Sequence, residues 1–145
     1  MLSDLYNEKL LGFAANIPRL GRLDAPDGTA THRSRLCGSQ VTVDVRMEGG
    51  KVADFAHEVK ACALGQASSA IMAANVIGAT VDELEEVERQ MTAMLKEGGP
   101  APTGRWEDLR YLEPVREHKS RHPSTLLTFG ATLEAARKAL SAEAA

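Results

Sequence analysis

This sequence has little net charge, no long apolar run and only two cysteines. The formal net charge is -3 over 145 residues, with 43% hydrophobic and 26% charged side chains. This balance is typical of an ordinary folded protein and argues against nucleic acid as a partner, because nucleic-acid binding relies on a clear excess of basic residues. A chain of this length buries roughly two thirds of its unfolded surface in one core, so we expect a single domain over residues 1–145.

No segment is apolar enough to predict a membrane span or a secretion signal. The most apolar stretch, residues 61–77, is interrupted by glycine and polar side chains and falls short of the roughly 20 apolar residues that a membrane span needs. Charged residues interrupt the first nine positions, and no cleavage site follows them. We therefore expect no membrane association and a cytoplasmic location, where the two cysteines stay reduced and bind metal, carry sulfur or pack.

Motifs of self-contained enzymes are also missing. The chain has no phosphate-binding G-x-x-x-x-G-K-[ST] loop, no dinucleotide-binding G-x-G-x-x-G pattern, no G-x-S-x-G nucleophile turn and no H-E-x-x-H zinc helix. We therefore assign no catalytic residue and do not expect an enzyme.

A hairpin is the clearest local structure. From residue 41 to residue 48, valines and a methionine alternate with polar side chains, as in a strand with one apolar face. Gly49 and Gly50 fit the two central positions of a type I′ turn, which both require positive φ, and residues 51–59 return as the second strand. Residues 29–35 are expected to form an edge strand before the hairpin.

Helical spacing of apolar residues predicts helices on both sides of the hairpin in sequence. The first helix carries Leu5, Tyr6, Leu10 and Phe13 after a cap at Ser3, and the second, rich in small residues, runs from Cys62 to Gly78. The third helix opens with a reciprocal capping box of Thr80 and Glu83 and stops at Gly98, and one or two helical turns then cover Trp106 to Leu112. The last helix follows an N-cap at Ser124, carries Leu126 to Leu140, and frays over residues 141–145.

The two cysteines fall at boundaries between these elements. Cys37 lies just before the alternating strand, and the following Gly38 leaves room for a cluster or a persulfide near the backbone. Cys62 begins the small-residue helix, where the helix dipole and unpaired N–H groups favour thiolate, the form that binds metal or attacks sulfur. Spacing alone leaves two interpretations open: a sulfur site, or two packed thiols of the kind common in protein cores.

A hairpin thus separates a Cys-Gly pair from a second cysteine that opens a small-residue helix. This order resembles the IscU/NifU N-terminal family, especially its SufU branch, over most of the chain. The similar segments are Tyr6 with Asn16-Ile17-Pro18-Arg19 and Gly21, where Ile17 is inserted into the family's Asn-Pro-Arg-Asn-x-Gly pattern; Leu36-Cys37-Gly38-Ser39; Gly49 to Phe55; Ala61 to Ala70; and Pro123 to Leu133.

The resemblance implies an α+β fold, a three-stranded antiparallel sheet with helices packed on one side. It also implies a protein that accepts sulfur from a cysteine desulfurase and assembles iron–sulfur clusters or binds zinc, usually through three cysteines and an aspartate. The first two cysteines match Cys37 and Cys62. The aspartate position holds Ser39 and the third-cysteine position holds Gly130, with Phe129 where many members have histidine.

Two thiols supply only half of the four ligands that a zinc ion or a cluster normally takes. A second subunit across a two-fold axis, a small thiol such as glutathione, or histidines of this chain would complete the shell. His118 and His122 are spaced i, i+4 and would face one way on a helix, although the basic residues around them favour a solvated stretch that docks an acidic partner. His57 is expected to be packed, and His32 is an outside candidate near Cys37.

Our leading hypothesis is a scaffold or sulfur acceptor in iron–sulfur cluster biogenesis, with Cys37 and Cys62 as sulfur ligands and Cys62 as the preferred acceptor. The expected partners are a SufS-like desulfurase, recipient apo-proteins and, for a shared cluster, a second copy of the chain. Two alternatives stay open: a non-metallated interaction or regulatory module that kept the fold, and a zinc protein that uses both cysteines with one or two histidines.

Overall fold

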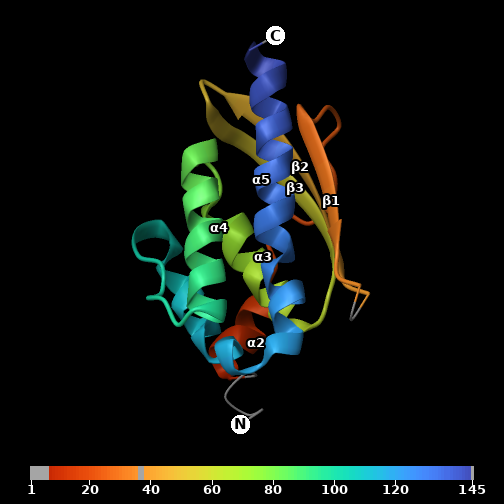
Figure 1. Ribbon diagram of the computed structural model, residues 1–145. Coiled ribbons are helices and arrows are strands. Elements are labelled where there is room, and N and C mark those ends of the chain that lie inside the picture. The colour runs from red at the N-terminus through yellow and green to blue at the C-terminus, as the bar shows by residue number, and fades with distance from the viewer. Residues whose placement is uncertain (1–6, 36–37, 145) are drawn as a thin grey trace.

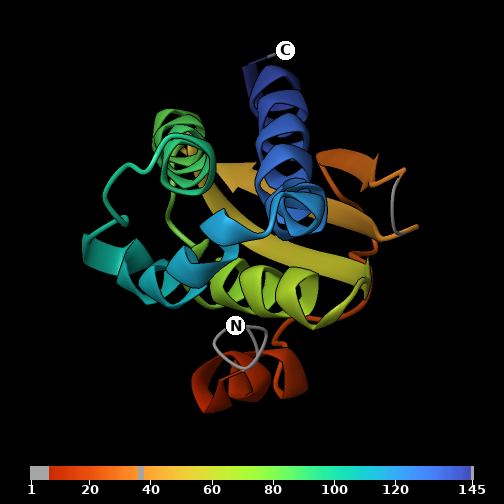
Figure 2. The ribbon, with the colours of Figure 1, turned by 60° about the horizontal axis from the view of Figure 1, so that its bottom comes forward.

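Helices cover one face of a three-stranded antiparallel sheet whose order is β1-β2-β3 (Figures 1 and 2). This arrangement confirms the expected α+β fold. The computed structural model describes residues 7–35 and 38–144. The elements are α2 (Glu8–Ala15), β1 (Gly28–Arg33), β2 (Gln40–Glu48), β3 (Lys51–Lys60), α3 (Ala63–Asn75), α4 (Val81–Lys96), the 3-10 helices η1 (Gly104–Glu117) and η2 (Lys119–Arg121), and α5 (His122–Ala144).

The β2–β3 hairpin forms as predicted. Glu48 pairs with Lys51, which leaves Gly49 and Gly50 as the two-residue turn with φ of 60° and 77°. The alternating valines of β2 are 0% exposed and face the helices. The edge strand β1 is also confirmed, although it begins one residue earlier than expected and ends two residues earlier.

The first described helix begins later than the sequence predicted. Its N-cap is Asn7, whose side chain accepts a hydrogen bond from the backbone N–H of Leu10 at 3.0 Å. Asparagine is a favoured N-cap because its oxygen satisfies an N–H that lacks a partner within the helix. The predicted cap Ser3, together with Leu5 and Tyr6, lies outside the described residues.

The final helix is longer than the sequence predicted. It begins at His122, so Ser124 lies inside its first turn and is not the N-cap. Pro123 is tolerated there because an N–H at the start of a helix would have no partner within it. The helix continues to Ala144 instead of fraying from residue 141, and Glu143 accepts a hydrogen bond from the N–H of Gly50 at 2.9 Å.

The capping box of α4 is only half confirmed. Thr80 accepts the N–H of Glu83 at 3.1 Å, as predicted. The carboxylate of Glu83 instead accepts from the indole N–H of Trp106 at 3.0 Å and pairs with Arg105 at 2.9 Å. These contacts hold η1 against α4, and η1 is longer than the one or two turns expected for this segment.

Helix α5 lies directly against β1. A Cβ atom built on Gly28 would lie 2.1 Å from the carbonyl oxygen of Ala135 and 2.7 Å from the nitrogen of Ala139. Distances this short leave no room for any side chain, so the backbone of the helix touches the backbone of the strand. The glycine is needed for space, because its φ is not positive.

The face of β2 opposite its valines is less solvated than alternation predicted. Asp44 is 0% exposed because the chain before β1 covers it. Its carboxylate accepts two hydrogen bonds from Arg22, one from the N–H of Leu23 and one from the hydroxyl of Thr29, all between 2.8 and 3.0 Å. Burial alone would raise the pKa of Asp44, but these hydrogen bonds outweigh it and hold the pKa below its ordinary value.

We expect Gly28→Ala to lower the free energy of unfolding by at least about 3 kcal/mol, because the added methyl group overlaps the backbone of α5. Gly12→Ala in α2 is the control: nothing lies within 4 Å of the added atom, and alanine should gain up to about 1 kcal/mol from helix propensity. Urea unfolding measures both variants. A Gly28→Ala protein as stable as the wild type would contradict the close packing of α5 on β1.

Asp44→Asn should lower the free energy of unfolding by about 2–3 kcal/mol at pH 7, because it removes the buried carboxylate that accepts two hydrogen bonds from Arg22. The pKa of Asp44 is lower in the folded than in the unfolded protein. Its contribution is therefore complete above about pH 4 and is lost as the pH falls through the folded-state pKa. Unfolding curves of wild type and variant should converge in acid.

Glu58→Gln is the matched control for Asp44→Asn. It removes a half-exposed carboxylate 3.8 Å from the same guanidinium. Exposed ion pairs contribute little, so the change should stay within about 0.5 kcal/mol. Equal losses from Asp44→Asn and Glu58→Gln would show that burial of the Asp44 pair does not matter.

Candidate functional site

Cys62 lies at the start of α3, as the sequence predicted. It is the N-cap residue, with extended backbone angles of φ -67° and ψ 172°, and its carbonyl accepts the N–H of Gln66 at 2.9 Å. Its thiol is partly exposed and makes no cap hydrogen bond to the helix. The sulfur Sγ lies 3.4 Å from the hydroxyl oxygen of Ser124 in the first turn of α5.

Ser124 is the site residue that sequence analysis missed. It is 2% exposed, and besides the sulfur it contacts the carbonyl of Arg121, to which its hydroxyl donates at 3.2 Å. Thr125 donates to the same carbonyl at 2.8 Å. Ser124 and Cys62 are 62 positions apart in the chain, so no local pattern could link them.

The loop between β1 and β2 carries the first cysteine, Cys37, which lies outside the described residues. On either side of it, the N–H of Ser34 donates to the carbonyl of Ser39 at 2.9 Å and the N–H of Gly38 donates to the carbonyl of Ser34 at 3.0 Å. Gly38 has φ 70°, which favours glycine. Ser39, which the resemblance matches to the family's aspartate, is 4% exposed.

Strand pairing places this loop at the same end of the sheet as Cys62. Arg33, the last residue of β1, pairs with Gln40, and Gln40 pairs with Lys60 at the end of β3. The chain continues from Lys60 directly into α3. The ends of the Cys37 loop and the start of α3 therefore share one edge of the molecule, at the lower right of Figure 1.

The space beside Gly130, which the resemblance matches to the family's third cysteine, is taken by another side chain. A Cβ atom on Gly130 would lie 2.7 Å from Nδ1 of His32. The other ring nitrogen of His32 is 3.1 Å from the carboxylate of Glu134, and the hydrogen bond from His32 is the main cause that lowers the pKa of Glu134. Phe129 is 1% exposed in the core. Neither Gly130 nor Phe129 supplies a side-chain ligand.

Gly130 is also displaced along α5 from the Cys62 contact. It follows Ser124 by six residues, which corresponds to about 9 Å along a helix axis. The sulfur of Cys62 thus meets the first turn of α5, whereas His32 meets the third.

The proposed pairing of His118 and His122 on one helix face is wrong. His118 has φ -127° and ψ 80°, which breaks the helix between η1 and η2. His122 is 5% exposed and its Nε2 lies 3.0 Å from the carbonyl oxygen of Val115. An i, i+4 metal site does not form, because one residue is outside a helix and the other is packed inside.

His57 is packed, as expected. It is 0% exposed, its ring edge meets Phe55, and Nε2 lies 2.9 Å from the carbonyl oxygen of Pro18. Burial lowers its pKa, although the hydrogen bond with Pro18 acts in the opposite direction. The backbone of Arg19 and Gly21 pairs with the backbone of His57, so this segment covers the edge of β3.

In residues 7–35 and 38–144, no three side chains of His, Cys, Asp or Glu come together in a way that would hold a metal ion. The basic stretch before α5 instead borders a cavity of about 390 Å³. Lys96, Arg116 and Lys119 line it, with His122 and Pro123 at the start of α5. This cavity fits the expectation that the stretch docks an acidic partner, which stays a prediction.

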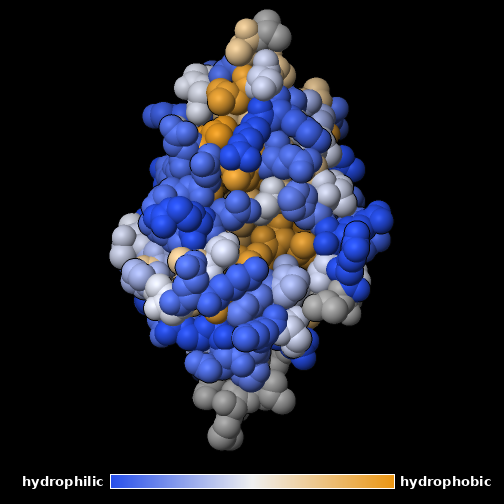
Figure 3. Space-filling view, viewed as in Figure 1, coloured by the Kyte–Doolittle hydropathy of each residue, from blue (hydrophilic) through white to orange (hydrophobic). Residues whose placement is uncertain are grey.

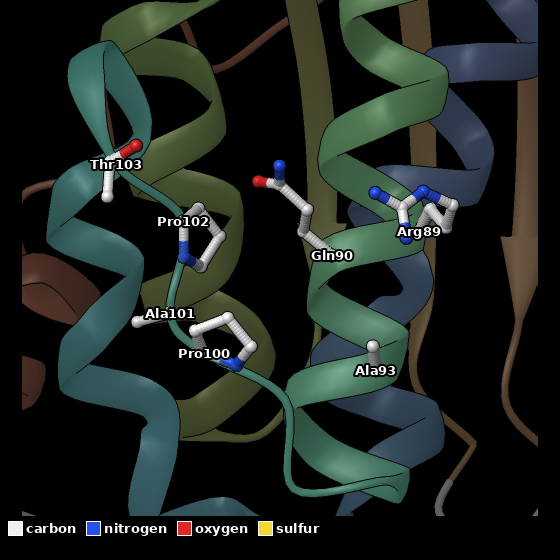
Figure 4. Close-up of a pocket in the computed structure, with 7 residues that line it drawn as sticks. All are labelled: Arg89, Gln90, Ala93, Pro100, Ala101, Pro102 and Thr103. Atoms are coloured by element: carbon white, nitrogen blue, oxygen red, sulfur yellow. The ribbon is translucent and has the colours of Figure 1, made fainter.

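A second cavity, of about 280 Å³, separates α4 from the proline-rich loop that follows it (Figure 4). Gln90 and Ala93 line it from α4, opposite Pro100 and Pro102. Its lining contains no cysteine, histidine or carboxylate. It is therefore not a candidate for holding metal.

The exposed hydrophobic side chains are scattered. The face in Figure 3 is mostly hydrophilic, with a few separate hydrophobic patches. Leu11, Leu20, Ile77 and Leu140 are each more than a third exposed and lie on separate segments. They do not identify an interface for the expected second copy. None of the helices in the described part of the chain has the length and apolar composition of a bilayer crossing.

Known proteins resemble this chain in both sequence and structure. Residues 5–106 match the family described as NifU-like N terminal domain. The chain is 25% identical to the iron–sulfur cluster assembly scaffold protein IscU of Thermotoga maritima over 134 residues. This aligned segment is 92% of this chain and 94% of that protein. A crystal structure described as a nitrogen-fixing NifU-like protein (N-terminal) from Brucella abortus has 57% identity and a TM-score of 0.94, over 97% of each chain.

A more distant structure shares the fold. It is described as an iron–sulfur cluster assembly scaffold for the SUF system of Fervidobacterium islandicum, with 22% identity and a TM-score of 0.84 over 92% of this chain and 98% of that one.

Gly130→Ala tests whether the His32 ring fills the space that a side chain at position 130 would need. Helix propensity alone favours alanine by up to about 1 kcal/mol, but the new methyl group meets the His32 ring, so we expect a net loss of about 1 kcal/mol. In a His32→Ala background the same substitution should become stabilising. Chemical denaturation of the four proteins gives this double-mutant cycle, and an unchanged effect in both backgrounds would contradict the contact.

Proposed function

This chain belongs to the NifU-like N-terminal domain family, and from that premise we propose that it is a scaffold for iron–sulfur cluster assembly. The observation that carries the proposal is the position of Cys62, a partly exposed thiol at the start of α3. The loop containing Cys37 begins and ends at the same edge of the sheet. The name of the Thermotoga maritima relative agrees with this role.

The proposal includes sulfur transfer from a cysteine desulfurase of the SufS type. The thiolate of Cys62 attacks the terminal sulfur of a persulfide on the desulfurase, which forms a new S–S bond and breaks the old one. The desulfurase cysteine leaves as a thiolate. Exposure of Cys62 at a helix start supports its role as acceptor, because the attacking sulfur must be reached from outside.

The cluster is the cargo of this protein, and Cys37 and Cys62 are the proposed ligands. A cluster normally takes about four protein ligands, so two further donors come from outside the pair. A second copy of the chain across a two-fold axis supplies two more thiolates in the simplest arrangement. The assembled cluster then passes to recipient apo-proteins. This chemistry requires reduced thiols and suits the cytoplasm.

A second candidate function is a non-metallated interaction or regulatory module. It is favoured by the His32 ring in the space beside Gly130 and by the burial of Ser39. Both observations concern positions that the resemblance matches to ligands of the family. Reconstitution separates the two functions.

Anaerobic reconstitution with iron, sulfide and a desulfurase should give the wild-type protein the visible absorbance of an iron–sulfur cluster. Cys37→Ser and Cys62→Ser should each abolish most of this absorbance, because each removes half of the thiolates that one chain contributes. Mass spectrometry should find a persulfide on the wild type and on Cys37→Ser, but not on Cys62→Ser.

Ser68→Ala is the control, because Ser68 is 0% exposed and its hydroxyl donates to the carbonyl of Gly65 within the same helix. It should reconstitute like the wild type. A wild-type protein that stays colourless and carries no persulfide would rule out the scaffold function in favour of the non-metallated module. Zinc bound to the purified protein at one ion per chain or per dimer would instead identify a zinc protein.

A further inference from the structure

The side chain that meets the sulfur of Cys62 belongs to α5 and not to the helix that Cys62 begins. Ser124 Oγ lies 3.4 Å from Sγ, a distance at which a hydroxyl and a sulfur share a hydrogen bond. Ser124 is 2% exposed, so water does not compete freely for its hydroxyl. A contact between a buried hydroxyl and a partly exposed thiol is well placed to fix the direction of the sulfur.

The hydroxyl of Ser124 has one hydrogen and two acceptors within reach, the carbonyl of Arg121 at 3.2 Å and the sulfur at 3.4 Å. Thr125 already donates to the same Arg121 carbonyl at the shorter distance of 2.8 Å. Ser124 can therefore turn its hydrogen to the sulfur without leaving that carbonyl unpaired. A buried carbonyl left without a donor would otherwise oppose the rotation.

The sulfur changes its hydrogen-bonding role when it is loaded. A thiol carries a hydrogen and can donate to Ser124, whereas a metal-bound thiolate carries none and can only accept. We propose that Ser124 is a positioning residue that donates its hydroxyl hydrogen to Cys62 Sγ when this sulfur holds metal or a cluster. This inference rests on the proposed function. Partners of this kind, one shell outside a metal, typically change metal affinity 10- to 100-fold.

The test uses Co²⁺ alone as a spectroscopic probe of metal binding to the full chain. Ser124→Ala should bind Co²⁺ at least about tenfold more weakly than the wild type, and its sulfur-to-cobalt charge-transfer band should shift because the thiolate loses a hydrogen bond. Ser124→Thr keeps the hydroxyl and should restore both the affinity and the band. Thermal unfolding of each metal-free variant checks that the fold is intact.

Ser68→Ala is the matched control. Ser68 is a buried helical serine whose hydroxyl donates to the carbonyl three residues earlier at 3.2 Å, as that of Ser124 does, whereas the hydroxyl beside the Cys62 sulfur is that of Ser124. It should leave both the affinity and the charge-transfer band unchanged. A loss in Ser68→Ala equal to the loss in Ser124→Ala would overturn the inference, because the effect would then come from helix structure.

A second measurement reads the contact without metal. In a Cys37→Ser background Cys62 is the only thiol, and its S–H stretching band in the infrared spectrum should move to higher frequency in Ser124→Ala and stay in place in Ser68→Ala. A shift of the same size and direction in Ser68→Ala as in Ser124→Ala overturns the inference, because the band would then report helix structure and not the contact of Ser124 with the sulfur.

The outcomes separate this inference from the proposed function. If the wild type binds Co²⁺ and Ser124→Ala binds it equally well with the same band, the positioning role is wrong and the scaffold function stands. If the wild type neither binds Co²⁺ nor gains colour on reconstitution, both are wrong.

Discussion

Close contact between the backbone of α5 and its neighbours is the constraint on which the site depends. Gly28 on β1 and Gly65 on α3 face this helix, and a Cβ atom on Gly65 would lie 3.0 Å from the carbonyl oxygen of Ser124. Because α3 cannot move away without losing this packing, Cys62 at its start stays within reach of Ser124. Gly65 thus allows the close approach of α3 and α5 beside the sulfur, while Gly28 allows the approach of α5 to β1 further along the helix, and neither glycine could bind a ligand through a side chain.

Local sequence signals predicted those helices and strands whose formation depends on residues close together in the chain. Alternating valines and the Gly49-Gly50 turn identified the hairpin, because strand period and positive φ are properties of adjacent residues. The start of α3 at Cys62 followed from the change to small residues. Prediction failed at helix ends, where a competing side chain decides: Glu83 binds Trp106 instead of closing the capping box, and Glu143 meets the hairpin turn.

Contacts between distant positions account for what sequence analysis missed at the site. The resemblance seen in the sequence placed Gly130 where the family's third cysteine is expected, but only the fold shows that the ring of His32 lies in the space beside it. Likewise, the i, i+4 spacing of His118 and His122 suggested a metal site, whereas tertiary packing turns His122 toward Val115. Spacing along a chain predicts ligands only where the intervening residues keep one regular helix.

A site with few ligands of its own suits a protein that must release what it assembles. A closed set of four protein ligands makes a metal site structural and long-lived, whereas an incomplete set leaves positions open to exchange. Under the proposed function, Cys62 is supported from outside the coordination shell, through its contact with Ser124, without a further thiolate at Gly130. Support of this kind would hold the sulfur in place for an incoming cluster and would add no bond that must break when the cluster leaves.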